Sequence, residues 1–168
     1  KEQRLFSAKA HFEGQPLADI LHPNDLDHAK LGEHPDFKQI KGTDETLSHY
    51  IVSVFIDIDG STNLFDKYDL EDVYSITNTI QSAAIHTIVS LGGHVQRLQG
   101  DGVFAYFGGK NIPHMQAVEM ALLATSMFTY FMQTDLKKVF AEDGIENIKT
   151  KIGIDFGYDE EVLWADRK

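Results

Sequence analysis

The stretch VFIDIDGSTNLF, residues 54–65, ends an apolar run with two acidic residues two positions apart and continues with a glycine and two hydroxyl residues. The run starts at Tyr50 as YIVSVFIDI, and its β-branched and aromatic residues predict a central buried strand that ends near Asp57. Acidic side chains at the end of such a strand, followed by a glycine, are typical of several kinds of phosphate chemistry. Motifs elsewhere in the chain are needed to distinguish these kinds of chemistry.

The composition excludes several classes of protein. The 168 residues, with 42% hydrophobic and 11% aromatic content, suffice for one globular domain with a single core. A net charge of −11 without a basic run repels a nucleic-acid backbone, so we expect no nucleic-acid partner. The absence of cysteine excludes disulfide and thiolate chemistry. Because we find neither a signal peptide nor an 18-residue apolar run, we expect a cytoplasmic protein without direct membrane insertion.

The chain divides into a polar N-terminal extension, residues 1–48, and a domain, residues 49–168. Turn signals without sustained periodicity predict only short helices in the extension. The domain is expected to run strand, helix, strand, strand, helix, strand, strand, with an acidic loop after the second helix. The expected ranges are 50–57, 70–91, 94–99, 103–107, 113–133, 148–156 and 160–165. This order predicts an α+β fold in which helices cover one face of a sheet and leave the other face free for a ligand or a partner chain.

The acidic motif alone leaves three enzyme classes open. In a phosphoaspartyl phosphatase, Asp57 would be the nucleophile and Asp59 its acid/base. That superfamily resembles a Rossmann fold and carries a further acid where this chain has Ala105, which disfavours it. A cyclic-dinucleotide synthase would show a Gly-Gly-Asp/Glu-Glu-Phe signature, which RLQGDGVFAYF, residues 97–107, lacks. A nucleotide cyclase accommodates both acidic segments at once.

The spacing of two aspartates predicts a metal site. Asp57 stands at the end of one strand and Asp101 at the tip of a neighbouring hairpin, so their carboxylates can converge on a pair of hard divalent cations, which prefer oxygen ligands. The alternative is that Asp101 merely shapes a Gly-Asp-Gly turn. Its partnership with Asp57 favours the metal site.

The segment after Asp57 is expected to bind phosphate. Its backbone amides stand at the start of a helix, where unpaired N–H groups and the helix dipole attract phosphate oxygens. Gly60 permits close approach, and Ser61 and Thr62 also suit helix capping. The predicted phosphate-binding residues are Asp59, Gly60, Ser61, Thr62 and Asn63.

FIDIDGST at 55–62, RLQGDGVFAYFG at 97–108 and KIGIDFG at 151–157 occur in an order that resembles the catalytic domain of the class III nucleotidyl cyclases. The resemblance covers about residues 50–157. It implies a palm-like, ferredoxin-like β-α-β-β-α-β sheet and a third metal ligand, the carbonyl of Ile58. It also implies two Mg²⁺ or Mn²⁺ ions as cofactors, and attack of the ribose 3′-hydroxyl on the α-phosphorus with release of pyrophosphate. In the family each active site lies between the two chains of a dimer, so we expect a homodimer.

In the purine cyclases of this family, the residue four positions before the hairpin aspartate differs with the substrate. It is typically Lys in adenylate cyclases and Glu in guanylate cyclases. Here it is Arg97, whose planar guanidinium suits a pyrimidine carbonyl. With the polar extension, this makes the chain resemble the Pycsar pyrimidine cyclases of bacterial anti-phage defence. Strand alternation places Ser53 and Phe55 on the face of Asp57 as candidates for the base pocket, whereas Tyr50 has the opposite parity. Tyr50 reaches the pocket only if the strand begins irregularly, and core packing is its expected role.

We therefore predict conversion of UTP into cyclic UMP, a second messenger read by a separate cyclic-nucleotide-binding effector in anti-phage defence. Two alternatives stay open, namely an adenylate or cytidylate cyclase and a degenerate cyclase-like module that senses nucleotides or dimerises. No segment before Lys168 matches the family's second base contact or its helix with the transition-state Asn and Arg. We therefore expect the C-terminal part of the domain to be incomplete.

Overall fold

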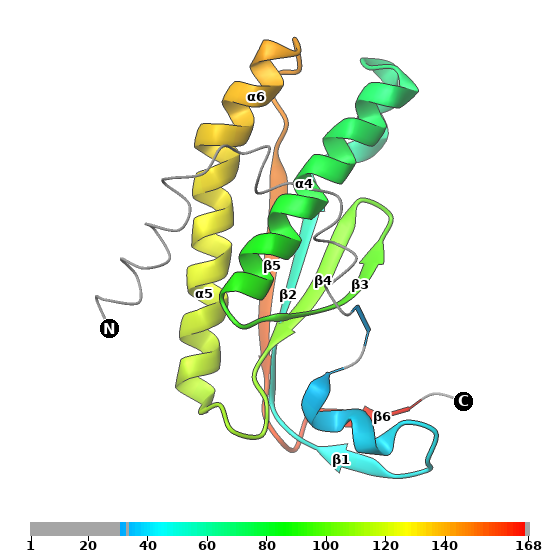
Figure 1. The fold of residues 1–168 in the computed structure, drawn as a ribbon, viewed down its shortest axis with the longest axis vertical. Helices are drawn as coiled ribbons and strands as arrows, with labels where there is room; N and C mark the ends of the chain where they lie inside the picture. Colours follow the sequence, from blue (N-terminus) through cyan, green and yellow to red (C-terminus); the bar gives the residue numbers. More distant parts are fainter. Residues whose placement is uncertain (1–30, 33, 167–168) are drawn as a thin grey trace.

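A four-stranded antiparallel sheet forms the centre of the protein, as seen in a computed structural model that describes residues 31–32 and 34–166 (Figure 1). Residues 1–30 of the expected extension, and its predicted short helices there, lie outside the described residues. The strands stand in the order β3-β4-β2-β5. Their bounds are Ile51–Ile58 for β2, His94–Gln99 for β3, Gly102–Phe107 for β4 and Thr150–Gly157 for β5.

Two helices connect these strands. Helix α4, Leu70–Ser90, joins β2 to β3, and helix α5, His114–Phe131, precedes β5. Each helical crossover skips one strand, so all neighbouring strands are antiparallel. This is the expected ferredoxin-like β-α-β-β-α-β order, and the prediction is confirmed.

The central strand β2 separates the two faces of the sheet by strict alternation. Its even-numbered residues are buried beneath the helices, and its odd-numbered residues are only partly buried on the opposite face. The buried set is Val52, Val54, Ile56 and Ile58. Strand β4 follows the same pattern, because Val103 and Ala105 belong to the helix-covered core. The face of β2 that carries Asp57 is therefore the one without α4 and α5, and we call it the open face.

The second helix runs further than its sequence pattern predicts. After α5 the chain passes through a π-helical turn, η3 at Met132–Leu136, and continues as α6 at Lys137–Glu142. The helix was predicted to end near Gln133 but ends at Glu142, because buried residues recur at every fourth position and hold the segment against the core, and the expected acidic loop follows at residues 143–149. The buried residues are Phe128, Met132, Leu136 and Phe140.

A second, two-stranded sheet covers one end of the open face. It pairs β1, Thr46–Ser48, with β6, Leu163–Ala165, and the six-residue 3₁₀-helix η1, Pro35–Ile40, packs beside it. We call residues 34–48 together with β6 the strap. The predicted last strand thus exists, but it pairs with β1, an unpredicted strand of the polar extension, and not with the main sheet.

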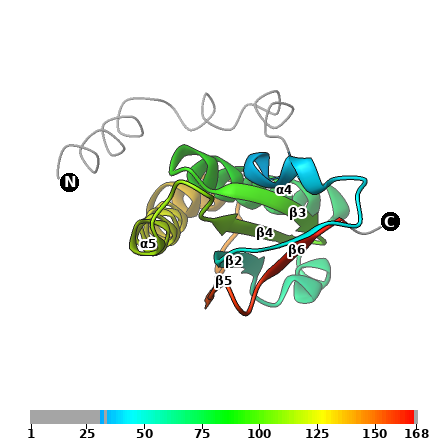
Figure 2. The same cartoon turned by 90° about the horizontal axis from the view of Figure 1, so that it is seen from below.

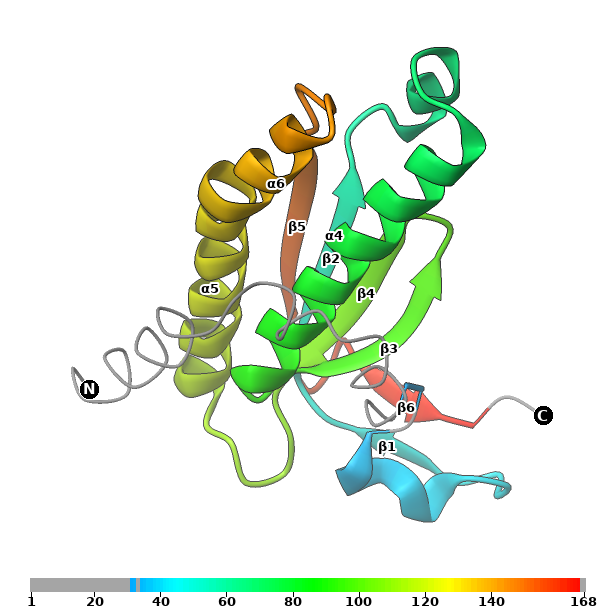
Figure 3. The ribbon, with the colours of Figure 1, turned by 45° about the horizontal axis from the view of Figure 1, so that its top comes forward.

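The strap changes the expectation of an entirely free face. Figure 2 shows α5 on one side of the sheet and β1 and β6 on the other. Figure 3 shows the strap at one end of the sheet, with the turn between β3 and β4 towards the other end. Tyr106 pairs with Ser53 on the open face, yet only 2% of it is exposed because His34 and Trp164 pack against its ring. Of the described residues, none forms a second layer over the other half of the open face, which is the half that a ligand or partner could reach.

Among the described residues, no helix is both long and apolar enough to span a membrane.

Candidate functional site

The uncovered end of the open face brings two predicted acidic residues together. Asp57 is the last open-face residue of β2, and Asp101 lies in the turn between β3 and β4. The backbone N–H of Ile58 donates a hydrogen bond of 3.2 Å to Oδ2 of Asp101, which ties the turn to the end of β2. The side chains of Asp57 and Asp101 are in hydrogen-bonding contact with each other. The convergence expected from the sequence is therefore present in the structure.

The electrostatics of this pair suit a cation. Burial raises the pKa of Asp57 above its ordinary value, and the negative charge of Asp101 and the hydrogen bond between the two carboxyls raise it further. A divalent cation relieves this repulsion, so the two carboxylates fit Mg²⁺ or Mn²⁺. Within residues 31–32 and 34–166, no group of three His, Cys, Asp or Glu side chains is placed to hold a metal ion. Further oxygens would come from the Ile58 carbonyl and the substrate.

The segment predicted to bind phosphate forms a tight turn into a short helix. Gly60 has a φ of +70°, a left-handed conformation that favours glycine, and it is the N-cap of η2, a six-residue 3₁₀-helix at Ser61–Asp66. No side chain caps this helix, so the expected capping by Ser61 and Thr62 is wrong. The N-cap position is taken by Gly60, which has no side chain to accept from the first N–H groups of the helix.

Two of the five predicted phosphate donors already have partners. The amide of Asp59 donates to the carbonyl of Lys149 at 2.8 Å, and the amide of Asn63 donates to the carbonyl of Gly60 at 2.9 Å. The amides of Gly60, Ser61 and Thr62 precede the first hydrogen bond of the helix, where N–H groups lack intrahelical partners. Of the five predicted amide donors, only these three are therefore left to bind an anion.

Lys151 is a candidate residue that the sequence reasoning missed. It pairs with Asp57 across β2 and β5, so both side chains lie on the open face. Its Nζ lies 2.6 Å from Oδ1 of Asp59, and this hydrogen bond, followed by the negative charge of Asp59, raises the pKa of Lys151. The available signal was the KIGIDFG strand, because antiparallel pairing with β2 in the correct register places a lysine opposite Asp57.

The predicted base-reading residues lie in one row across the open face. Arg97 pairs with Phe104, which in turn pairs with Phe55, so three strands contribute to the row. The guanidinium carbon of Arg97 lies 5.2 Å from the centre of the Phe104 ring, a cation–π contact. A Cβ at Gly102 would lie 2.7 Å from the ring of Phe55, so glycine at this position makes room for the ring. Phe104 was not among the predicted residues.

Tyr50 does not join this row. It is 4% exposed, belongs to the helix-covered core, and its hydroxyl donates a hydrogen bond to the carbonyl of Ile112. Its expected core-packing role agrees with this position, and its proposed base contact does not. Ser53 is on the open face, as predicted, and its Oγ donates to the carbonyl of Asp155 at 3.4 Å.

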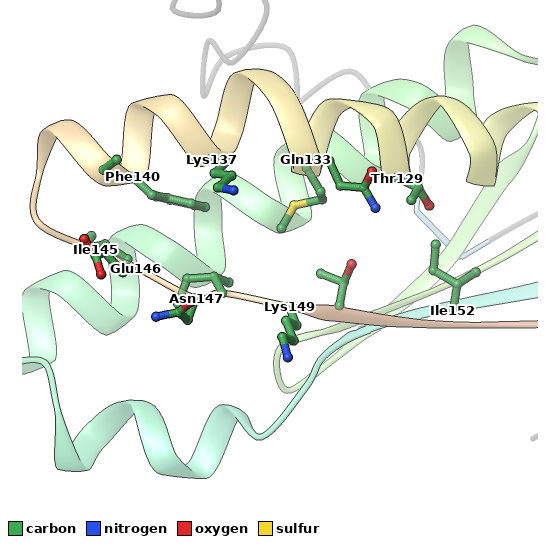
Figure 4. A pocket seen from close by; sticks show the side chains of 13 residues that line it. Thr129, Gln133, Lys137, Phe140, Ile145, Glu146, Asn147, Lys149 and Ile152 are labelled. Atoms are coloured by element: carbon green, nitrogen blue, oxygen red, sulfur yellow. The ribbon is translucent and has the colours of Figure 1, made fainter.

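A cavity of about 610 Å³ lies away from the acidic pair, between the α5–α6 helix and β5 (Figure 4). Gln133 and Phe140 extend from the helix towards β5, and Ile145 and Asn147 lie at one end. The loop at 145–149 separates this cavity from a smaller one, of about 110 Å³, beside Gly60. This loop is bound to the phosphate segment through the Asp59–Lys149 hydrogen bond.

Comparison with known proteins gives similar sequences, among them cytidylate cyclases. No protein-family model matches the chain. A cytidylate cyclase from Staphylococcus aureus is 45% identical over 135 residues, which cover 80% of this chain and 31% of that protein. A cytidylate cyclase from Escherichia coli is 36% identical over 140 residues, covering 81% of this chain and 30% of that protein. The chain thus spans about a third of the length of these relatives.

A solved structure has a similar fold. The adenylyl cyclase CyaB from P. aeruginosa superposes with a TM-score of 0.63 at 22% identity, over 68% of this chain and 59% of that one. The match supports the fold only, and the arrangement of Asp57, Asp101 and Lys151 has to carry the chemical argument.

Proposed function

The chain belongs to the class III nucleotidyl cyclases, within the Pycsar pyrimidine cyclases, and from this premise we propose that the protein converts a pyrimidine nucleoside triphosphate into a 3′,5′-cyclic nucleotide and pyrophosphate. The observation that carries the proposal is the contact between Asp57 and Asp101 at the uncovered end of the sheet. The negative charge of Asp101 raises the pKa of Asp57, a cation relieves this repulsion, and a metal-bound triphosphate is a substrate that brings one.

In this proposal each part of the uncovered end has one task. Asp57 and Asp101 hold divalent ions, together with the Ile58 carbonyl. When bound, these ions acidify the ribose 3′-hydroxyl and neutralise charge on the triphosphate. The amides of Gly60, Ser61 and Thr62 donate to phosphate oxygens. Lys151, on the same face, adds a positive charge beside them.

Arg97 is proposed to read the base, with Phe55 and Phe104 as an aromatic floor. A guanidinium only donates hydrogen bonds, and it presents two donors in a planar fork. Cytosine offers two neighbouring acceptors, O2 and N3, whereas N3 of uracil is itself a donor. We therefore propose CTP as the preferred substrate, in agreement with the names of the two relatives, and UTP as the second candidate.

The proposal includes a homodimer whose active sites lie between the chains. Asp57 of one chain would face Arg97 of the other. The uncovered half of the open face supports such an interface, because the aromatic residues Phe55 and Phe104 that line it are only partly buried. We further propose that the protein works in the cytoplasm, where nucleoside triphosphates are available, and that its product is a second messenger in anti-phage defence, read by a separate effector.

Incubation of the protein with each of the four nucleoside triphosphates and Mn²⁺, with chromatographic separation of the products, tests the substrate. We expect cyclic CMP to form fastest. Fastest formation of cyclic UMP would favour the second candidate, and fastest formation of cyclic AMP would contradict the pyrimidine assignment. Nucleotide binding without any product would support the nucleotide-sensing module instead of an enzyme.

A further inference from the structure

Asp59 is held by the segment around the start of β5 through both its backbone and its side chain. Its amide donates to the carbonyl of Lys149 at 2.8 Å, and its carboxylate accepts from Nζ of Lys151 at 2.6 Å. The ion pair lies at the surface, with side-chain exposures of 40% for Asp59 and 69% for Lys151. Without a nucleotide, the ammonium of Lys151 is therefore neutralised by a neighbour on the protein itself.

The ammonium of Lys151 lies where it could bind the phosphate oxygens of a triphosphate. Lys151 is opposite Asp57 in the strand pairing, and its positive charge acts on the Asp57 carboxylate as well as on Asp59. A triphosphate held through metal ions at Asp57 and Asp101 would bring its oxygens to this face, next to Gly60. The phosphate oxygens and the carboxylate of Asp59 would then compete for one donor.

We propose that Asp59 sets the affinity of the site, because its carboxylate holds Lys151 in the nucleotide-free protein and gives it up to the triphosphate. This rests on the proposed function, and it adds a role for the side chain of Asp59, whose amide is already engaged with Lys149. Asp59 is a positioning residue that acts through Lys151. It keeps the lysine extended along the open face and makes the triphosphate displace a partner before binding.

The size of the effect follows from the exposure of the pair. Surface ion pairs are weak because water screens them and ordering two long side chains costs entropy. Release of Lys151 should therefore change triphosphate affinity by roughly two- to five-fold. A change of this size alters the fraction of protein occupied without altering the chemistry at the metal ions.

The test measures binding of inorganic tripolyphosphate in the presence of Mg²⁺, by isothermal titration calorimetry, so that it does not depend on cyclisation. The variants are Asp59→Asn, Lys151→Gln and the double variant, with Asp66→Asn as the matched control. Asp66 is an exposed acid at the end of η2, so its replacement removes one negative charge from the same segment. We expect Asp59→Asn to tighten binding roughly two- to five-fold, Lys151→Gln to weaken it, and Asp66→Asn to change it much less.

The double variant decides the mechanism. If Asp59 acts through Lys151, Asp59→Asn has no effect once Lys151 is glutamine. An equal tightening in both backgrounds would mean that Asp59 simply repels the anion, and weaker binding by Asp59→Asn alone would mean that it does not compete; either result overturns the proposal. Tripolyphosphate binding with this pattern but without any cyclic product would leave the inference standing and reject the proposed activity. Absence of binding by the unaltered protein would reject both.

Discussion

The two ends of the open face are built from the same strands and have opposite characters. At the strap end, Tyr106 of β4 is enclosed by His34 and Trp164, and burial raises its pKa to about 12. At the other end, the same pair of strands presents Phe55 and Phe104 and leads to Asp57 and the turn with Asp101. The alternation of residues along a strand determines which face of the sheet a side chain lies on, but not whether that face is covered by other parts of the protein. The two ends differ because the strap covers one of them. The covered end contributes to the stability of the domain, and the uncovered end is accessible for the proposed reaction.

Replacement of Asp57 or Asp101 should have the largest effect, because both lie at the uncovered end of the open face. Asp57→Asn and Asp101→Asn should each lower the proposed cyclase activity by roughly 100- to 1,000-fold, because each removes a charged oxygen from the proposed metal site. Steady-state turnover measures the effect, and circular dichroism checks that the fold persists. Asp155→Asn, on the same face but towards the strap, should retain activity. Full activity of the Asp101 variant would reject the metal site.

Mixing two inactive proteins tests whether the uncovered end is completed by a second chain. Asp57→Ala and Arg97→Ala damage different parts of the proposed site. After subunit exchange in an equal mixture, half of the dimers are mixed and each has one intact site, so about a quarter of the original activity should return. Lack of recovery despite demonstrated exchange would place the whole site within one chain.

Acidification should act on the strap end. Burial lowers the pKa of His34 and of His94 below the ordinary 6.5, so both are neutral in the folded protein. Their contribution to stability is complete above about pH 6.5 and is lost as the pH falls, by up to roughly 1.4 kcal/mol per pH unit for each histidine that binds a proton only on unfolding. Of the groups that act on them, Asp36 opposes this effect for His34, while His49 and Lys38 add to it.

The single tryptophan of the chain reports this change directly. Trp164 stacks on Phe37 at 4.2 Å and lies 5.6 Å from His34, so its fluorescence should change between pH 7.5 and 5.5 as the strap loosens. His94→Phe should reduce the pH dependence of the denaturation midpoint. His114→Gln, an exposed histidine at the start of α5, serves as the control and should leave it unchanged. An unchanged signal over this range would show that protonation of His34 and His94 does not govern the strap.

The smallest expected effect is a gain in the stability of the metal-free protein when Asp57 is replaced by Asn. The raised pKa of Asp57 means that its charged form is disfavoured in the fold, so above that pKa it destabilises the metal-free protein. Asp57→Asn should raise the Tm at pH 7 by about 1–2 °C without metal, and this gain should vanish as the pH falls through the pKa of Asp57. Mn²⁺ should raise the Tm of the unaltered protein only. A lower Tm for the metal-free variant would show that the carboxylate has a structural role.

The sequence predicted what depends on local pattern. The alternation of β2, the 21 residues of α4 and the β3–β4 hairpin follow from periodicity and from turn residues, and all were expected. The proximity of Asp57 and Asp101 also follows, since both lie at the same ends of adjoining strands.

Long-range pairing explains what was missed. The strap depends on β1 meeting β6, which lies more than a hundred residues further along the chain, with Leu47 opposite Trp164. The three residues of β1 have no pattern of their own, and the sequence of β6 predicts a strand without naming its partner. Lys151 was missed for a related reason, because its place beside Asp59 depends on the register of β5 against β2. The ring of Phe104 was overlooked because its place between Arg97 and Phe55 depends on the register of β4 against β2, a pairing between segments far apart in the sequence.

The π-helical turn η3 has a consequence for how the length of this protein can vary. Phe128, Met132, Leu136 and Phe140 are four residues apart, a spacing that would drift by roughly 120° over three steps of a regular α-helix. The wider turn absorbs one residue, or roughly 100°, and keeps all four on the core side. A chain one residue shorter between Phe128 and Leu136 would form an ordinary helix with the same side chains in the same places. A single-codon deletion at this point should therefore be neutral, and a homologue one residue shorter here can share the same core.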